Sequence, residues 1–289
     1  TICPPPIIAA DLGVHLTHVK TKCTNVGDPV SYKVLVTNGK GGSVVAGQSI
    51  TVTVTLANGL SAITPEGGTD WKVTTNGTTV TANYSGNYPV KPVSTLEPIL
   101  INATMRMPSS SSPVSYAIVK TLRDSNAANN TGEDVLLMCS PEFVISKIQK
   151  LSGPAHTGQS IAYTIIVTNK STAGPLIAGE AIKVTIKFLH GLKQINAKGA
   201  DWQLTTTSAP AMVVATYSSL SPVLAGAHLP GIMLSGIMTT SALPTVTIGV
   251  TVKTSSGGSD EKKKPLKHFS FSAHGVASQA FVLRRRSEL

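Results

Sequence analysis

The sequence is poor in the residues on which most binding and catalytic chemistry depends. Of its 289 residues, 13% are charged, 4% are aromatic and three are cysteine. No apolar run approaches the ~20 residues that a membrane-spanning helix needs, so no integral membrane protein is predicted. The first ten residues, TICPPPIIAA, lack the basic start and apolar centre of a signal peptide, and we expect none in this chain.

Motifs of catalysis and cofactor binding are also missing. The sequence has no G-x-S-x-G, H-E-x-x-H, Walker or dinucleotide-binding pattern, and no C-x2-C pair for zinc. Its 14 acidic residues are scattered singly, so no acid/base pair can be assigned. His15 and His18, three residues apart, would lie on opposite faces of a strand and cannot share a metal. We therefore expect no enzyme, no cofactor and no metal site.

The positive charge is concentrated in one part of the chain. Lys and Arg outnumber Asp and Glu by 24 to 14, a net charge of +10. Much of the excess lies within residues 253–289. A solvated tail explains such a run, and contact with an anionic polymer, a lipid surface or a neighbouring subunit is the alternative. Few aromatic residues accompany the basic ones, so nucleic-acid binding is not expected.

The chain repeats itself once. The segment GDPVSYKVLVTN (27–38) returns as GQSIAYTIIVTN (158–169), with five of twelve positions identical. Further matches follow in the same order: AGQSITVTVTLANGL (46–60) with AGEAIKVTIKFLHGL (178–192), Asp70-Trp71 with Asp201-Trp202, and Tyr84-Ser85 with Tyr217-Ser218. An unchanged order with little drift in spacing indicates a tandem duplication.

Within each copy, apolar residues alternate with polar ones. A period of two places one row of side chains in a core and the other in water, as in an antiparallel sheet with one solvated face. Turn sequences such as Asn38-Gly39 and Asn58-Gly59 separate the runs. Seven or eight short strands per copy predict an immunoglobulin-like sandwich, twice. The inward rows are expected at Tyr32–Val36, Ile50–Leu56, Tyr163–Val167 and Ile182–Phe188.

The fold prediction is therefore all-β, with two tandem immunoglobulin-like antiparallel β-sandwiches in an elongated arrangement and an extension at each end. Val135–Met138 is expected as the last strand of the first copy, and Phe143–Ile145 as the start of the second. The short connection at Cys139-Ser140-Pro141 limits bending. The predicted parts are an arm at 1–10, repeats at 11–139 and 142–275, and an apolar and basic tail at 276–289.

An ordered set of motifs carries a resemblance to a known family. The set is Asp11-Leu12-Gly13-Val14, Gly27 with Tyr32, Val36-Thr37-Asn38, Asn58-Gly59-Leu60 and DSNAANNT (124–131). Both copies resemble the conserved repeat domain of bacterial and archaeal surface proteins, the domain of unknown function eleven type. The resemblance implies immunoglobulin-like modules in secreted or wall-attached stalks and adhesin arms, without catalysis. The second copy departs from it, because SSGGSDEKKK (255–264) replaces the DSNAANN run.

The three cysteines are Cys3, Cys23 and Cys139. In immunoglobulin-like sandwiches the first and last strands often run side by side in parallel, so their carboxyl ends meet. Cys23 follows the first strand and Cys139 ends the last, which favours a Cys23–Cys139 disulfide. A Cys3–Cys139 bond and three free thiols are the alternatives. With the favoured pairing, Cys3 is a candidate for an intermolecular bond.

Several polar and aromatic positions have both a structural and a functional interpretation. Trp71 and Trp202 could stack on sugars, but their shared repeat position favours packing inside the sandwich. The run from Asp124 to Asn130 could supply oxygen ligands to calcium, although a turn with side chain-to-backbone bonds is favoured. Five N-x-S/T sequons fit an extracytoplasmic protein and are glycosylation candidates: Asn76, Asn83, Asn102, Asn129 and Asn169.

The end of the sequence contains an apolar segment beyond those needed to complete the second sandwich. Phe269, Phe271 and Ala273 alternate with serines and can complete the second sandwich, yet VASQAFVL (276–283) follows. Left exposed, this segment would aggregate, so it either folds back as an extra strand or adds to an open sheet of a neighbour. The Pro4-Pro5-Pro6 arm could also reach across a junction. The candidate donor residues are Val276, Ser278, Ala280, Phe281, Val282 and Leu283.

These features predict an extracellular or cell-surface structural protein. Copies of it would form a surface filament or pilus-like fibre by β-strand addition between subunits. The alternative is a cell-surface adhesin or stalk module that binds carbohydrate or another surface polymer through loops or exposed tryptophans.

Overall fold

The structure, a computed structural model, is all-β. Its strands and one short 3-10 helix (η1, Ala127–Asn129) are joined by turns, and the described residues form no α-helix. The chain divides into two compact units, Thr1–Cys139 and Ser140–Leu289, each with its own hydrophobic core. The residues described are 8–19, 23–107, 112–150, 156–190, 192–208, 211–218, 220–239, 245–254 and 267–272.

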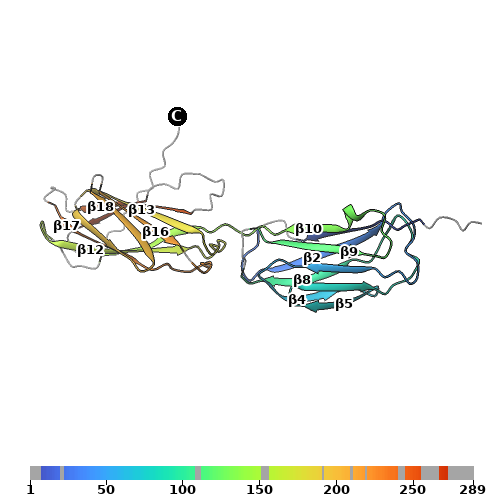
Figure 1. The fold of residues 1–289 in the computed structure, drawn as a ribbon. Helices are drawn as coiled ribbons and strands as arrows, with labels where there is room; N and C mark the ends of the chain where they lie inside the picture. Colours follow the sequence, from blue (N-terminus) through green and yellow to red (C-terminus); the bar gives the residue numbers. More distant parts are fainter. Residues whose placement is uncertain are drawn as a thin grey trace, which may run out of the picture. The chain divides into compact units, whose positions relative to one another are not determined.

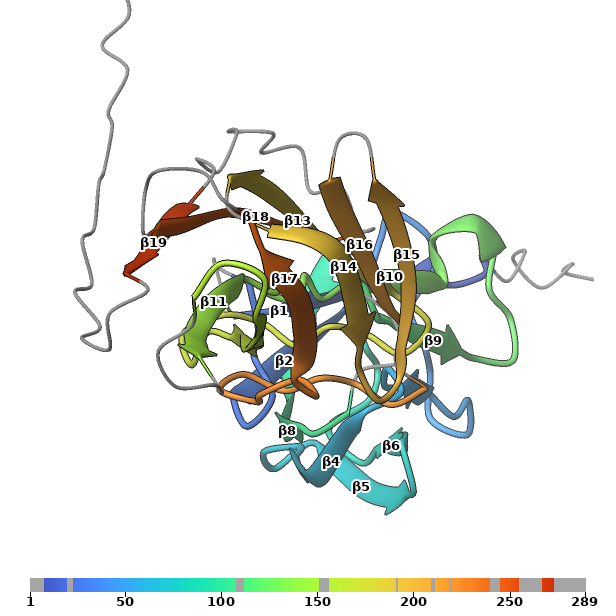
Figure 2. The same ribbon diagram turned by 90° about the vertical axis from the view of Figure 1, so that its left-hand side faces the viewer.

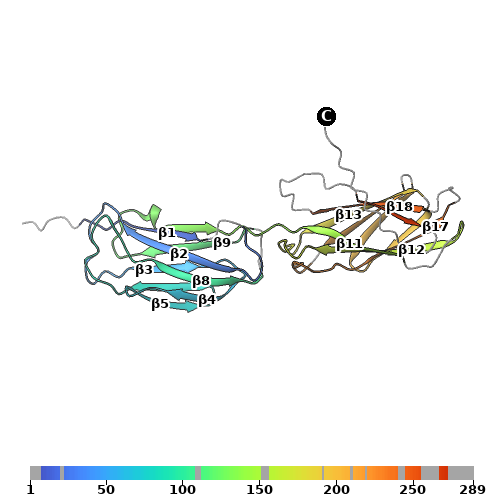
Figure 3. The same cartoon turned by 180° about the vertical axis from the view of Figure 1, so that it is seen from behind.

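The first unit is built from ten strands. They are β1 (Leu12–His18), β2 (Pro29–Asn38), β3 (Thr51–Thr55), β4 (Leu60–Glu66), β5 (Trp71–Asn76), β6 (Thr79–Tyr84), β7 (Ser94–Thr95), β8 (Ile99–Met105), β9 (Val114–Lys120) and β10 (Thr131–Val135). One sheet has the order β1-β2-β8-β4, with β7 paired to β2, and the other has the order β10-β9-β3-β6-β5 (Figures 1 and 3). All ladders between these strands are antiparallel.

This strand order is that of an immunoglobulin constant-type sandwich with one insertion. The sheet β1-β2-β8-β4 corresponds to the four-stranded sheet of that fold, and β3-β9-β10 corresponds to the three-stranded one. The hairpin β5–β6 is inserted between β4 and β8 and extends the second sheet beside β3. The expected seven or eight strands were too few, because the hairpin and the two-residue β7 add to the basic set.

The second unit has the same strand order (Figure 2). Its sheets are β11-β12-β17-β14 and β15-β16-β13-β18-β19, so its inserted hairpin is β15–β16. Each strand of the second unit has a counterpart in the first, and among the described residues β7 alone has no counterpart in the second. The strands are β11 (Phe143–Lys150), β12 (Ser160–Asn169), β13 (Ala181–His190), β14 (Leu192–Lys198), β15 (Trp202–Ser208), β16 (Ala211–Ser218), β17 (Ile232–Met238), β18 (Thr245–Thr254) and β19 (Lys267–Ser272).

The predicted inward rows form the two cores. Tyr32, Val34 and Val36 are fully buried, as are their counterparts Tyr163, Ile165 and Val167. The rows at Ile50–Leu56 and Ile182–Phe188 are buried at alternate positions in the same way. Removing one row of each strand from water supplies the main driving force for the fold, about 25 cal/mol for each Å² of apolar surface.

Two boundary and turn predictions need correction. The last strand of the first unit is β10, Thr131–Val135, and not Val135–Met138. After Val135 the chain leaves the sheet, and Met138 forms a parallel bridge with Thr24 instead. Asn38 does not close a turn through its own backbone. It is the last residue of β2 and is buried.

The buried side chain of Asn38 holds three chain segments together. Its amide nitrogen donates to the carbonyl oxygens of Gly42 (3.0 Å) and Val90 (3.1 Å), and its oxygen accepts from the Asp11 N–H (3.1 Å). Asn169 repeats this arrangement at the end of β12, with bonds to the Gly174 and Val223 carbonyls and from the Glu142 N–H. The V-T-N ending of both repeats is therefore a packing feature. The partners satisfy a polar group that would be costly to bury alone.

Candidate functional site

A disulfide closes one end of the first unit. Cys23 and Cys139 are bonded, with their Cα atoms 4.7 Å apart. Beside the bond, the Thr24 N–H donates to Leu137 O (2.7 Å) and the Cys139 N–H donates to Thr24 O (3.0 Å). The segments that follow β1 and β10 thus run in parallel and meet, which is the geometry behind the favoured pairing. Cys3 lies outside the described residues.

The two tryptophans occupy equivalent buried positions, so they are not sugar-binding platforms. Trp71 is 5% exposed and Trp202 is 7% exposed. Each indole N–H donates to a backbone carbonyl at 2.8 Å, that of Glu97 or Pro230. Each ring also packs against the tyrosine of the paired strand, with ring centroids 5.3 Å apart. The packing interpretation is confirmed, and the alternative of exposed, sugar-stacking tryptophans is wrong.

The polar run between β9 and β10 is a turn tied to the start of β1. Asp124 accepts from the backbone N–H groups of Leu12 (3.1 Å) and Asn126 (2.9 Å). Asn126 caps η1 through the Ala128 N–H, and Asn129 donates to the Asp11 carboxylate (2.8 Å). The side-chain oxygens of Asp124 and Asn126 accept hydrogen bonds from backbone N–H groups, as the turn interpretation predicts. In the part of the chain that the structure describes, no three His, Cys, Asp or Glu residues gather as a metal site would require.

The sequons differ in accessibility. Asn76 and Asn83 are exposed, and Asn102 and Asn129 are partly exposed. Asn169 is fully buried, and its amide nitrogen donates two hydrogen bonds. A glycan on that nitrogen has no room in the folded unit, so Asn169 is withdrawn as a glycosylation candidate.

The histidines of β1 have separate environments. His15 is exposed, whereas the His18 Nδ1 lies 2.6 Å from the Asp134 carboxylate on β10. The contact joins β10 to β1. Among the described residues, no helix is long and apolar enough to cross a membrane.

The predicted donor segment, Val276–Leu283, lies outside the described residues, as does most of the 1–10 arm. The strand before it, β19, is described: Lys267–Ser272 pairs with Thr245–Val250 of β18. Because β19 is the counterpart of β10, the second module has its full set of strands before residue 276.

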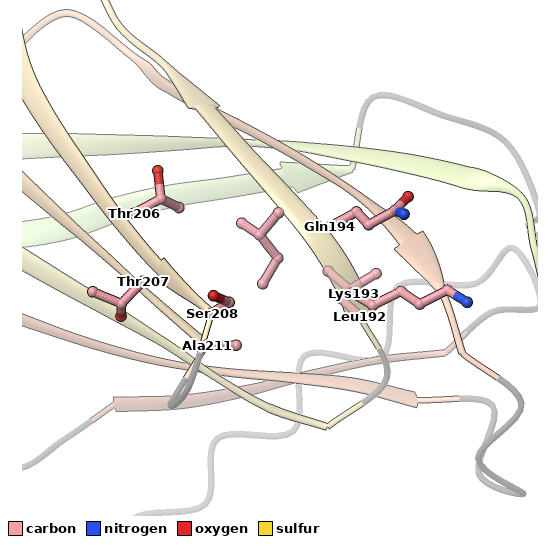
Figure 4. A pocket seen from close by; sticks show the side chains of 8 residues that line it. Leu192, Lys193, Gln194, Thr206, Thr207, Ser208 and Ala211 are labelled. Atoms are coloured by element: carbon pink, nitrogen blue, oxygen red, sulfur yellow. The ribbon is translucent and has the colours of Figure 1, made fainter.

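A hollow opens between the two sheets of the second unit. Its volume is about 360 Å³, and side chains from the start of β14 and from the β15–β16 hairpin face each other across it (Figure 4). The turn from Lys198 to Trp202 joins β14 and β15 at one end, and the hollow lies where the strands diverge at the other. Its lining residues are Leu192, Lys193, Gln194, Ile195, Thr206, Thr207, Ser208 and Ala211.

The hollow marks the side on which the second core is incompletely covered. Leu192 and Ile195 pack on the core but remain partly exposed, as do Leu204 and Ala211. In the first unit, the equivalents of Ile195 and Leu204, which are Ile63 and Val73, are also partly exposed, but Leu60, the equivalent of Leu192, is only 5% exposed. The β15–β16 hairpin has seven residue pairs against six in β5–β6. Sequence reasoning missed this site because its residues alternate like those of any other strand.

Comparison with known proteins gives distant structural likeness only. The sequence matches no family model and no curated protein sequence. Among solved structures, the chain is similar to the Actinomyces fimbrial adhesin FimA, with 11% identity and a TM-score of 0.34 over 93% of this chain and 100% of that chain. For the collagen adhesin of S. aureus the values are 13%, 0.27 and 91% of each chain. At this level of likeness, the roles of those proteins are not transferred to this chain.

Proposed function

We propose that the chain is an extracellular structural protein whose copies assemble into a surface filament by strand addition. A disulfide that joins segments more than a hundred residues apart fits an oxidising compartment. Two modules with one strand order fit a structural repeat, and the resemblance to surface-protein repeat domains supports the same role. The described residues offer buried packing groups and no convergent set of reactive ones.

One observation carries the proposal. The second sandwich completes its strand order with β19, which ends at Ser272, and the apolar segment Val276–Leu283 comes after it. The segment is therefore not needed to finish the module. An apolar β-forming segment that follows a module with its full set of strands is what donor-strand assembly requires.

The test compares the intact chain with a variant that lacks residues 276–289. In sedimentation velocity over a range of concentrations, the intact chain should form species larger than a monomer, and the shortened chain should stay monomeric. A control in which Arg284, Arg285 and Arg286 are all changed to Gln keeps the apolar segment and should still assemble. A monomeric intact chain at high concentration would refute the proposal.

The alternative, a carbohydrate-binding arm, would have to bind through loops, because Trp71 and Trp202 are buried. It would also be monomeric with or without the tail, so the same experiment separates the two functions.

A further inference from the structure

The outer strands of the sheets differ in how they are protected against pairing with another chain. An outer strand presents unpaired N–H and C=O groups, and proteins usually shield it with charged residues, proline, a bulge or a covering segment. Apart from the two-residue β7, each of the four sheets has two outer strands in the described part of the chain: β1, β4, β5, β10, β11, β14, β15 and β19.

Six of these strands carry an evident shield. The pairing of β4, β11 and β14 is interrupted by a register shift, and each also contains charged residues. Charged residues also lie in β5 (Lys72), β10 (Glu133 and Asp134) and β19 (Lys267). These strands are poor templates for an incoming strand.

The strand β1 has no Lys, Arg, Asp or Glu, but β10 lies against it. The Leu12 N–H is bonded to Asp124, and His18 contacts Asp134 at 2.6 Å. A Cβ atom on Gly132 of β10 would come within 3.0 Å of the Val14 carbonyl oxygen, so the two backbones are in close approach. The edge of β1 is covered.

Only β15 among the described outer strands has none of these features. Its sequence, WQLTTTS, contains no charged residue and no proline, and its register with β16 is unbroken over seven pairs. Its counterpart β5 (WKVTTN) has Lys72 where β15 has Gln203. Residues Gln203 and Thr205–Ser208 are exposed, and the hollow of about 360 Å³ lies beside the end of the strand.

We infer that the edge of β15 is the acceptor for strand addition, and that it takes the segment Val276–Leu283 of a second copy. This inference rests on the proposed function and names the site at which it operates. Backbone bonds to β15 would extend the sheet to a sixth strand, and a side chain of the added strand would enter the hollow. Phe281 is the one aromatic residue of the segment. A cavity of ~150 Å³ already accommodates benzene, so the hollow has room for its ring.

The occupant is a second copy because the chain's own segment cannot pair with this edge along its whole length, starting from Val276. In the order β15-β16-β13-β18-β19, the strands β19 and β15 stand at opposite edges of one sheet (Figure 2). Four spacings of ~4.8 Å give a width of ~19 Å, and an added strand would lie ~5 Å further out. Val276 is four residues beyond the end of β19, a reach of at most ~14 Å.

The first experiment introduces into β15 of the full-length chain a charged residue such as β5 has at Lys72. The variants Gln203→Lys and Thr205→Lys should each raise the concentration at half-assembly by about tenfold, because an added strand would have to desolvate the new ammonium group. The matched control, Thr74→Lys in β5, adds the same charge at the exposed position equivalent to Thr205 and should leave that concentration unchanged. In a Trp71→Phe background, unchanged Trp202 fluorescence would show that the second unit of each variant is folded.

The second experiment locates the contact directly. A chain with Phe281→p-benzoylphenylalanine is mixed with an equal amount of isotopically labelled chain and irradiated, and cross-linked peptides are identified by mass spectrometry. Cross-links between labelled and unlabelled chains, at residues 192–211, are expected. Cross-links within one chain, or to the first unit, would overturn the inference.

The outcomes separate this inference from the proposed function. If assembly needs the tail but ignores both lysine variants, the acceptor is elsewhere and the filament proposal stands. If the intact chain never assembles, the filament proposal fails and the acceptor assignment fails with it.

Discussion

Removing the disulfide gives a prediction that concerns the first unit alone. The bond joins Cys23 and Cys139 across a sequence separation of 116 residues, and the second unit contains no cysteine. For a closed loop of this length, the chain-entropy model gives a stabilisation of about 4–5 kcal/mol. The variant Cys139→Ser should therefore unfold far more readily in the first unit and leave the second unchanged.

The two buried tryptophans allow each unit to be followed separately. In a Trp202→Phe background the fluorescence reports the first unit through Trp71, and in a Trp71→Phe background it reports the second. With a urea dependence of about 2 kcal/mol per molar, the loss should lower the midpoint of the first unit by about 2 M. A Cys3→Ser variant serves as the thiol control and should shift neither midpoint.

Two results would refute this reasoning. A shift of less than about 0.5 M for the first unit would mean that the bond constrains the unfolded chain little. An equal shift in both units would mean that they do not unfold independently. Cys23→Ser and the double variant should match Cys139→Ser, because each removes the same bond.

Three further predictions concern buried groups. Burial raises the pKa of Tyr32 in the first unit and of Tyr163 in the second to about 12, so the stability of each unit is complete below the ordinary pKa of 10 and falls by roughly 3 kcal/mol as pH rises through 12. Chemical denaturation of each unit should show this loss, and Tyr163→Phe should remove it from the second unit alone. Asn38→Ala removes the side-chain partners of the Gly42 carbonyl and the Asp11 N–H and should destabilise the first unit by about 2–4 kcal/mol in urea titration, whereas a variant such as exposed Asn76→Ala should change it by less than about 0.5 kcal/mol. In a glycosylating host, peptide mapping should find Asn169 unmodified on the folded protein, since its side chain is fully buried, and a glycan there would contradict the structure.

Much of the fold follows from periodicity. The alternation in Tyr32–Val36 and Ile182–Phe188 identifies strands and their inward faces, because a sheet with one wet face allows no other arrangement. The repeat then places Trp71 and Trp202 in equivalent sites. The boundary at Val135 was wrong because Leu136 and Met138 continue the alternation and are buried, although the chain has already left the sheet.

The acceptor site could not be predicted because it depends on relations between strands. The sequences WQLTTTS (β15) and WKVTTN (β5) are similar, and Lys72 in β5 has no evident importance in the sequence alone. It matters only because both strands are outer strands, where a charged residue hinders pairing with another chain. The hollow depends on how far β14 and β15 diverge and on the length of the β15–β16 hairpin. Likewise, Asn169 matches a sequon perfectly, and only its packing shows that it is inaccessible.

Electron microscopy of the purified, intact chain by negative stain tests the central claim most directly. We predict filaments for the intact chain and single particles for the chain that lacks residues 276–289. Fields of single particles from the intact chain, at concentrations well above those of the sedimentation series, would contradict the account.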